Sequence, residues 1–80
     1  MPAKRKTRAD RLQEQFAAMY RSGKAVTGLR DPEIADSIGL SVTSLWSRRK
    51  DPSKLTLGEI SKLSAVLRWS DEDVVKLINT

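Results

Sequence analysis

The chain has 80 residues, with 15 Lys and Arg against 10 Asp and Glu, and a formal net charge of +5. It has no Cys and no His, which excludes disulfides, thiolate zinc sites and cysteine nucleophiles and removes the commonest general base. Its length fits one domain with one small core, in which about 60% of the unfolded chain's surface is buried. The absence of Cys fits a reducing cytoplasm.

The excess positive charge lies at the N-terminal end, because residues 1–30 hold eight basic and two acidic side chains. No apolar segment follows the basic start, so we expect no signal peptide. No apolar run approaches the roughly 20 residues that span a bilayer, so we expect no membrane association. We expect residues 1–6 to form a flexible basic arm that suits a polyanion, or alternatively a solvated leader that only aids solubility.

A first helix is predicted from about Thr7 to Ser22. Thr7 and Asp10 form a Thr-x-x-Asp pattern, which is close to a capping box. Gly23 is expected to end the helix in the left-handed conformation, and a loop over residues 24–30 follows. The apolar stripe of this helix comprises Leu12, Phe16, Met19 and Tyr20.

A short second helix is predicted from Asp31-Pro32, with Asp31 as the N-cap and Pro32 at the first helical position. Gly39 ends this helix because glycine adopts positive φ without strain. The inward residues are Ile34, Ala35 and Ile38.

A third helix is predicted from Val42 to about Arg49, with Ser41 as its N-cap. Asp51-Pro52 ends it, because a residue that precedes proline is disfavoured in a helix.

The last two helices are predicted from capping boxes, one at Thr56 with Glu59 and one at Ser70 with Asp73. The expected buried residues are Leu57, Ile60, Leu63 and Leu67 in the fourth helix and Val74, Leu77 and Ile78 in the fifth. The predicted fold is therefore all-α, with five short helices around one core over residues 7–80.

Residues 31–50 carry the most specific pattern, two short helices joined by a turn at residues 39–41. Ala35 lies four residues before Gly39, so a small residue stands where the helices cross and a glycine where the chain turns. The apolar residues that would lock the helices together are Ile34, Ile38, Leu40 and Leu45. From about Leu29 to Ile78 the chain resembles the helix-turn-helix regulators of the phage repressor/Cro type, also called xenobiotic-response-element regulators. The resemblance also includes Pro52, Leu55-Thr56-Leu57 and Asp71-Glu72-Asp73.

The resemblance implies a lambda-repressor-like domain whose second motif helix enters the major groove of DNA. The residues that would then read base edges are Ser41, Val42, Thr43, Trp46, Ser47 and Lys50. The expected phosphate contacts are Arg30, Arg48, Arg49 and Lys54. The arm residues Lys4, Arg5, Lys6 and Arg8 would either follow the DNA backbone or enter a minor groove. Asp31 departs from the family pattern, which usually has Gln or Thr in this region, and a capping role would limit its repulsion of DNA.

Several of these residues have a second interpretation. Trp46 either faces DNA or folds back beside Leu45 and Val42 into the core, and the core position is slightly favoured. The basic triplet 48–50 either contacts DNA or is a solvated helix end that the helix dipole favours. Trp69 is expected in the core or in a dimer contact.

The function that these expectations favour is a Cro-like, sequence-specific transcriptional repressor of a phage or mobile element, which acts by occupying an operator. The expected partners are double-stranded DNA and a second copy, with half-sites about 34 Å apart. The dimer surface would come from the fifth helix and the C-terminus, with Val75, Ile78 or Trp69 partly exposed there. We expect a cytoplasmic protein without cofactor, metal or small-molecule ligand. We expect no enzyme, because the Ser, Lys and Asp residues form no recognisable catalytic arrangement. The alternative is an antitoxin or accessory subunit whose main partner is a protein.

Overall fold

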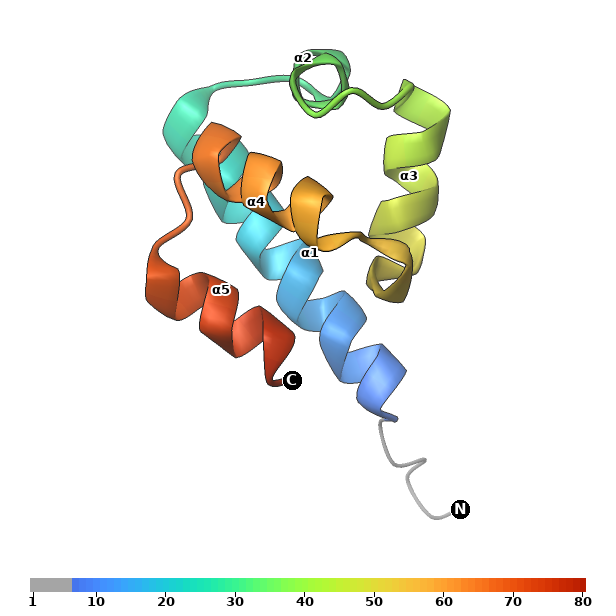
Figure 1. Cartoon of the computed structure of the whole chain (residues 1–80). Helices are drawn as coiled ribbons and strands as arrows, with labels where there is room; N and C mark the ends of the chain where they lie inside the picture. Colours follow the sequence, from blue (N-terminus) through green and yellow to red (C-terminus); the bar gives the residue numbers. More distant parts are fainter. Residues whose placement is uncertain (1–6) are drawn as a thin grey trace.

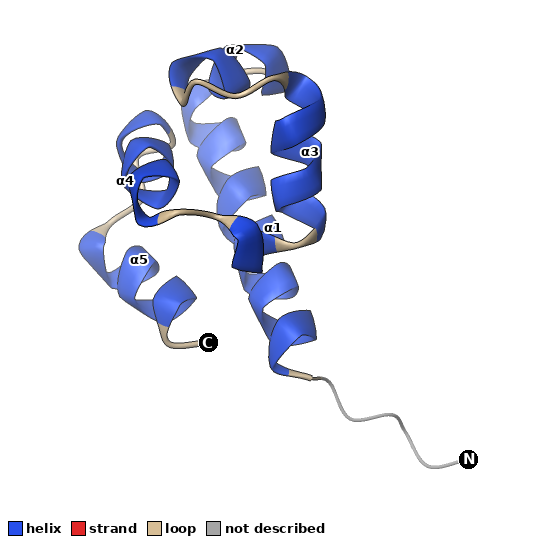
Figure 2. Ribbon diagram, turned by 45° about the vertical axis from the view of Figure 1, so that its right-hand side comes forward, coloured by secondary structure: helices blue, strands red, loops and turns tan. Residues whose placement is uncertain are grey.

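The structure is a computed structural model and describes residues 7–80. This part of the chain forms five α-helices and one short 3-10 helix and contains no strand (Figures 1 and 2). The helices are α1 (Arg8–Thr27), α2 (Asp31–Ser37), α3 (Val42–Lys50), the 3-10 helix η1 (Pro52–Lys54), α4 (Leu57–Val66) and α5 (Asp71–Ile78).

The longest helix, α1, is the element against which most of the others pack. It contacts α3, η1 and α5, whereas α2 contacts α3 and α4. The chain end lies beside the first turn of α1, where Arg8 Nε donates a hydrogen bond to the Thr80 carbonyl at 2.9 Å. Figure 1 shows α3 alongside α1 and α5 on another side of α1, so that α3 keeps one long side without a neighbouring helix.

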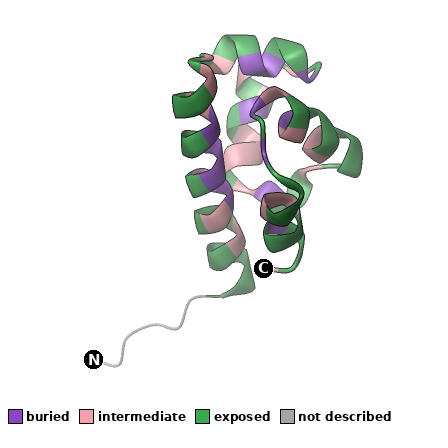
Figure 3. Cartoon of the chain, turned by 90° about the vertical axis from the view of Figure 1, so that its left-hand side faces the viewer, coloured by how far each residue is buried: buried purple, intermediate pink, exposed green. Residues whose placement is uncertain are grey.

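One apolar core fills the space between the helices. At its centre the Phe16 ring lies 5.9 Å from the Tyr20 ring and 5.9 Å from the Trp69 ring, centroid to centroid. Trp69 Nε1 donates to the Met19 carbonyl at 3.0 Å, so this buried polar atom is satisfied. The buried strip along the inner side of α1 is visible in Figure 3. The core residues are Phe16, Met19, Tyr20, Ile34, Ala35, Ile38, Leu45, Leu63, Leu67, Trp69 and Leu77.

Short-range signals place most of the helix starts. The three expected capping pairs at Thr7, Thr56 and Ser70 all form, each with reciprocal hydrogen bonds to the residue three positions later. Ser41 caps α3 through its Oγ, which accepts from the Ser44 N–H at 3.1 Å. The expected turn glycine, Gly39, has φ +74°.

The predicted end of the first helix is wrong, because α1 continues through Gly23 to Thr27 and ends at Gly28. Gly28 has φ +71°, and its N–H donates to the Lys24 carbonyl at 2.8 Å. Gly23 is buried and lies against Leu67, the residue that follows α4. A Cβ placed on Gly23 would be 2.6 Å from the Leu67 Cβ, so the glycine is required for close helix packing and not for a turn.

The expected N-cap of the second helix is displaced by one residue. Arg30 occupies the cap position, and Asp31 and Pro32 are the first two residues of α2. The backbone N–H of Arg30 donates to Glu33 Oε1 at 3.2 Å, so this donor at the helix start has a partner. Asp31 is therefore free of a capping role, and its carboxylate contacts α1 and α3 instead.

Two residues that were expected to face inward are exposed, Leu57 at 78% and Ile78 at 52%. Each residue of an α-helix is rotated by about 100° from the one before it, so three positions make about 300°, which is 60° short of a full turn. Residues that are repeatedly spaced by three therefore do not stay on one side of the helix. Leu57 is thereby rotated about 120° from Leu63, and Ile78 about 100° from Leu77, the buried residue of α5. The outer parts of both predicted stripes lie at the surface.

Candidate nucleic-acid interface

The segment from α2 to α3 is held by its own turn as well as by the core. The Leu40 N–H donates to the Ala35 carbonyl at 2.9 Å after the reversal at Gly39. Ile34 and Leu45 are both fully buried and fix the inner sides of the two helices. The burial of Leu45 therefore determines which side of α3 faces away from the core.

Four of the six residues that were expected to read bases share this outer side of α3. Helical steps of about 100° place Thr43, Ser47 and Lys50 on the side opposite the buried Leu45, with Trp46 at one edge. Thr43 and Lys50 are exposed, Ser47 is half-buried, and Trp46 is 53% exposed. We refer to Thr43, Trp46, Ser47 and Lys50 as the α3 stripe. It combines a hydroxyl-bearing pair with a cation and an aromatic ring.

The other two expected base readers lie elsewhere. The Ser41 hydroxyl is used at the start of α3, where it accepts from the Ser44 N–H and donates to Ser44 Oγ at 3.0 Å. Val42 is half-buried and packs against the core. Neither side chain belongs to the α3 stripe.

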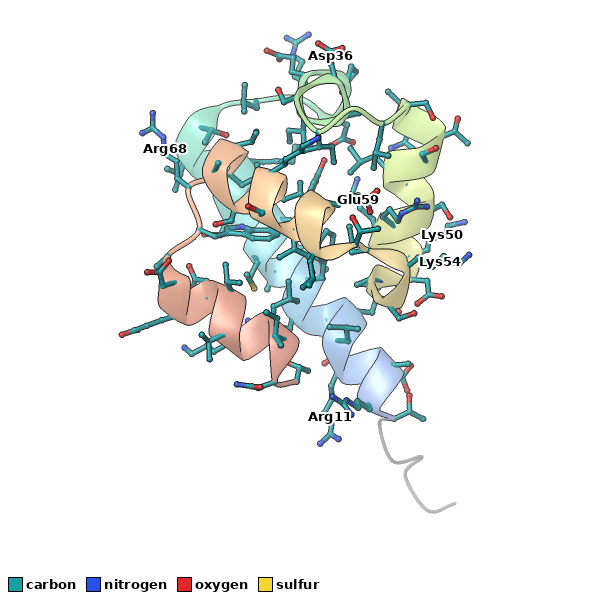
Figure 4. All side chains as sticks on the ribbon, in the orientation of Figure 1. Arg11, Asp36, Lys50, Lys54, Glu59 and Arg68 are labelled. Carbon is teal, nitrogen blue, oxygen red and sulfur yellow. The ribbon has the colours of Figure 1, made fainter. Side chains whose placement is uncertain are left out.

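The expected phosphate contacts divide into two groups. Arg30 and Lys54 are exposed, and Figure 4 shows Lys54 on the same side of the molecule as Lys50 of the α3 stripe. Arg48 and Arg49 instead pair within the protein. Arg48 Nε lies 3.3 Å from Glu59 Oε1 of α4, and Arg49 pairs with Asp31 of α2. These two arginines tie α3 to its neighbours.

Asp31 is the centre of a polar cluster that joins three helices. Its Oδ1 accepts from the Tyr20 hydroxyl at 2.6 Å and from Lys24 Nζ at 2.9 Å, and its Oδ2 accepts from Arg49 Nη1 at 3.2 Å. The Arg49 guanidinium also lies 4.4 Å from the centre of the Tyr20 ring. The aspartate therefore fixes the end of α3 against α1 and the start of α2.

The same cluster shifts two pKa values in opposite directions. The Tyr20 hydrogen bond is the largest cause that lowers the pKa of Asp31, partial burial opposes it, and Lys24 and Arg49 add to the lowering. Burial is the largest cause that raises the pKa of Tyr20, and the hydrogen bond and charge of Asp31 add to it. Both shifts favour the neutral phenol beside the ionised carboxylate.

Trp46 is not a core residue, which corrects the slightly favoured expectation. Its side chain forms one wall of an open hollow of about 370 Å³ between α1 and α3. Phe16, which lines the same hollow, and Leu45, which precedes Trp46 in α3, are fully buried, whereas Trp46 is 53% exposed. The hollow, which we call the α1–α3 hollow, is lined by Gln13, Phe16, Ala17, Trp46, Arg49 and Lys50. Sequence reasoning did not find the contribution of Gln13 and Ala17, since no spacing signal links them to α3.

Most of the expected basic arm lies outside the described residues, namely Lys4, Arg5 and Lys6. Arg8 is the first residue of α1 and is exposed, and its guanidinium bonds to the chain end. It therefore contacts the protein itself in this structure.

Comparison of the chain with protein-family models, with curated protein sequences and with solved structures found no match. In residues 7–80 no helix is both long enough and apolar enough to cross a membrane. Among the same residues, no group of three or more Asp and Glu side chains gathers as a metal ion would require.

Proposed function

We propose that the chain is a sequence-specific DNA-binding protein that acts as a repressor by occupying an operator. The observation that carries the proposal is the α3 stripe, a set of hydroxyl, aromatic and cationic side chains on the unpacked side of a short helix. An α-helix of this kind fits the major groove, where Thr, Ser and Lys side chains can bond to base edges and phosphates. In this proposal α2 and α3 form a helix-turn-helix.

The distribution of charge supports the same partner. Lys50, Lys54 and Arg30 are exposed cations on or near the motif, and the whole chain carries +5. Arg48 and Arg49 are paired with the carboxylates of Glu59 and Asp31. Their main role is therefore to hold α3 in place, and the exposed cations are the ones available to phosphates. Affinity would then come from the exposed cations and the N-terminal basic residues, and specificity from the α3 stripe.

A test of the stripe is the replacement Thr43→Ala. The loss of one hydroxyl and one methyl from an exposed position should leave the stability within about 0.5 kcal/mol. It should lower the affinity for the preferred duplex about tenfold and relax the preference at one or two base pairs. Selection from a randomised duplex pool, followed by titration of the preferred site, measures both effects. The control is Ser22→Ala, which removes an exposed hydroxyl from α1. If Thr43→Ala and Ser22→Ala select the same duplex sequences and bind them with the same affinity, base reading by α3 is contradicted.

A second copy of the chain is the proposed protein partner, because one module of this size gives a modest DNA interface. The surface that suits it is the apolar groove of about 330 Å³ between α4 and α5, where Leu57, Val75 and Ile78 are at least half exposed. Self-association through this groove would bury these side chains symmetrically.

In sedimentation experiments the protein should associate at micromolar concentration, and Ile78→Lys should shift it towards monomer without unfolding it. A chain that remains monomeric at high micromolar concentration would rule out this dimer in the absence of DNA. Recovery of a different, stoichiometric protein chain from the host would instead favour an accessory subunit.

A further inference from the structure

The α1–α3 hollow has a chemical pattern that the α3 stripe alone does not explain. Phe16 is fully buried and Ala17 half-buried, so these two residues give the part formed by α1 an apolar surface, with Gln13 one turn away. The indole of Trp46 forms a wall and is 53% exposed. Gln13, Arg49 and Lys50 add an amide and two cations, and no carboxylate is among the lining residues. An apolar surface edged by cations fits a ligand that is apolar at one end and anionic at the other.

The position of Trp46 on α3 indicates which part of DNA would reach the hollow. Around the axis of α3, the Trp46 position is rotated by about 60° from that of Thr43, towards α1. The Lys50 position is rotated from Thr43 by only about 20° in the same direction. The major groove is about 12 Å wide and an α-helix about 10–12 Å across, so the strands that border the groove pass close to both flanks of a bound helix. Trp46 would then face a strand backbone and not the floor of the groove.

We propose that the α1–α3 hollow binds one deoxyribose-phosphate unit of the DNA strand that borders α3. The sugar packs on Trp46 and Ala17, and Lys50 and the Gln13 amide bond to the phosphate. Arg49 is held by Asp31 at 3.2 Å and adds its charge from the edge. This inference rests on the proposed function. It adds α1 to the DNA interface, assigns Trp46 and Lys50 to the backbone, and leaves base reading to Thr43 and Ser47.

The test is the pair Ala17→Glu and Ala18→Glu. Both changes add one negative charge at adjacent positions of α1, so their long-range effects on DNA binding are nearly equal. Only Ala17 lines the hollow, whereas the exposed Ala18 lies on the side of α1 towards Trp69 and Asp73. With the full chain and its preferred duplex, Ala17→Glu should weaken binding at least about tenfold and Ala18→Glu by less than about threefold. Thermal unfolding of both variants shows whether they remain folded.

Two further measurements keep the inference testable if Ala17→Glu does not fold. Gln13→Glu keeps the side-chain shape and should weaken binding more than Gln15→Glu on the same helix. Acrylamide should quench the fluorescence of the exposed Trp46, and duplex DNA should protect it, whereas the 8% exposed Trp69 is shielded in both states.

The outcomes separate the inference from the proposed function. Specific binding by the wild-type chain, with equal effects of Ala17→Glu and Ala18→Glu, would overturn the backbone site and leave the role of α3 intact. Unprotected Trp46 fluorescence in the bound state would overturn it as well. No preference of the wild-type chain for any duplex would instead refute the proposed function itself.

Discussion

Gly23→Ala should lower the free energy of unfolding by about 2 kcal/mol, although glycine to alanine in a helix interior ordinarily stabilises by about 1 kcal/mol. The reason is the approach of α1 to the end of α4, where an added Cβ would meet the Leu67 Cβ at 2.6 Å and the Leu67 carbonyl oxygen at 3.1 Å. Neither atom is the far end of a flexible side chain, so the helices must separate. Overpacking of this kind costs roughly 1–3 kcal/mol.

The matched control is Gly58→Ala in α4, because the nearest atom to an added Cβ there is Thr56 Oγ1 at 3.8 Å. This change should stabilise the protein by up to about 1 kcal/mol. Thermal unfolding of the two variants should therefore show shifts of opposite sign, with a fall of roughly 10 °C for Gly23→Ala. Stabilisation by both changes would contradict the close packing at Gly23.

Asp31→Asn should lower the free energy of unfolding by about 2 kcal/mol at neutral pH. Most of the loss comes from the hydrogen bond with the buried Tyr20 hydroxyl, since a hydrogen bond to a charged group contributes about 1.5–3 kcal/mol. The pairs with Lys24 and Arg49 contribute less, because these side chains are 35% and 39% exposed. Asp36→Asn is the control, as it removes an exposed carboxylate from the same helix and should change stability by less than about 0.5 kcal/mol.

The pKa shifts of Asp31 and Tyr20 determine the direction in which the stability changes with pH. The pKa of Asp31 is lowered in the folded state, so its contribution is fully present above the ordinary aspartate pKa of about 3.9. It is lost as the pH falls through the lower folded pKa. The pKa of Tyr20 is raised, so its contribution is lost as the pH rises above the ordinary tyrosine value of about 10.

Chemical denaturation at several pH values measures both effects. The difference between wild type and Asp31→Asn should be constant from about pH 5 to 9 and should shrink below about pH 4. A difference that is already absent at pH 7 would show that Asp31 does not hold α3 in place.

The sequence predicted the elements whose causes are local. The pairs Thr56 with Glu59 and Ser70 with Asp73 are three residues apart, so their hydrogen bonds depend only on the chain around them. The all-α class and the five helices follow from such signals. The choice between Gly23 and Gly28 as the end of α1 does not, because it depends on the distant Leu67. Likewise, the positive φ of Arg68 falls at a position where glycine would be expected.

The same division applies to the candidate site, where local spacing was predictable and contacts between distant residues were not. The α3 stripe follows from helical spacing once α3 is recognised, and Thr43, Ser47 and Lys50 were expected there. The partners of Asp31 could not be foreseen, because Tyr20 and Arg49 lie 11 and 18 positions away in the chain. The same holds for the exposure of Trp46, because it depends on how α3 packs against α1, which lies about 30 positions away in the chain.

The measurement that tests the central claim most directly is a competition titration of the full chain at several salt concentrations. It compares a duplex from the DNA that flanks the protein's own gene with a random duplex of equal length. We predict an affinity ratio of about a thousandfold or more at physiological salt, and a binding constant that falls as salt rises. A ratio near one at every salt concentration would contradict sequence reading by α3.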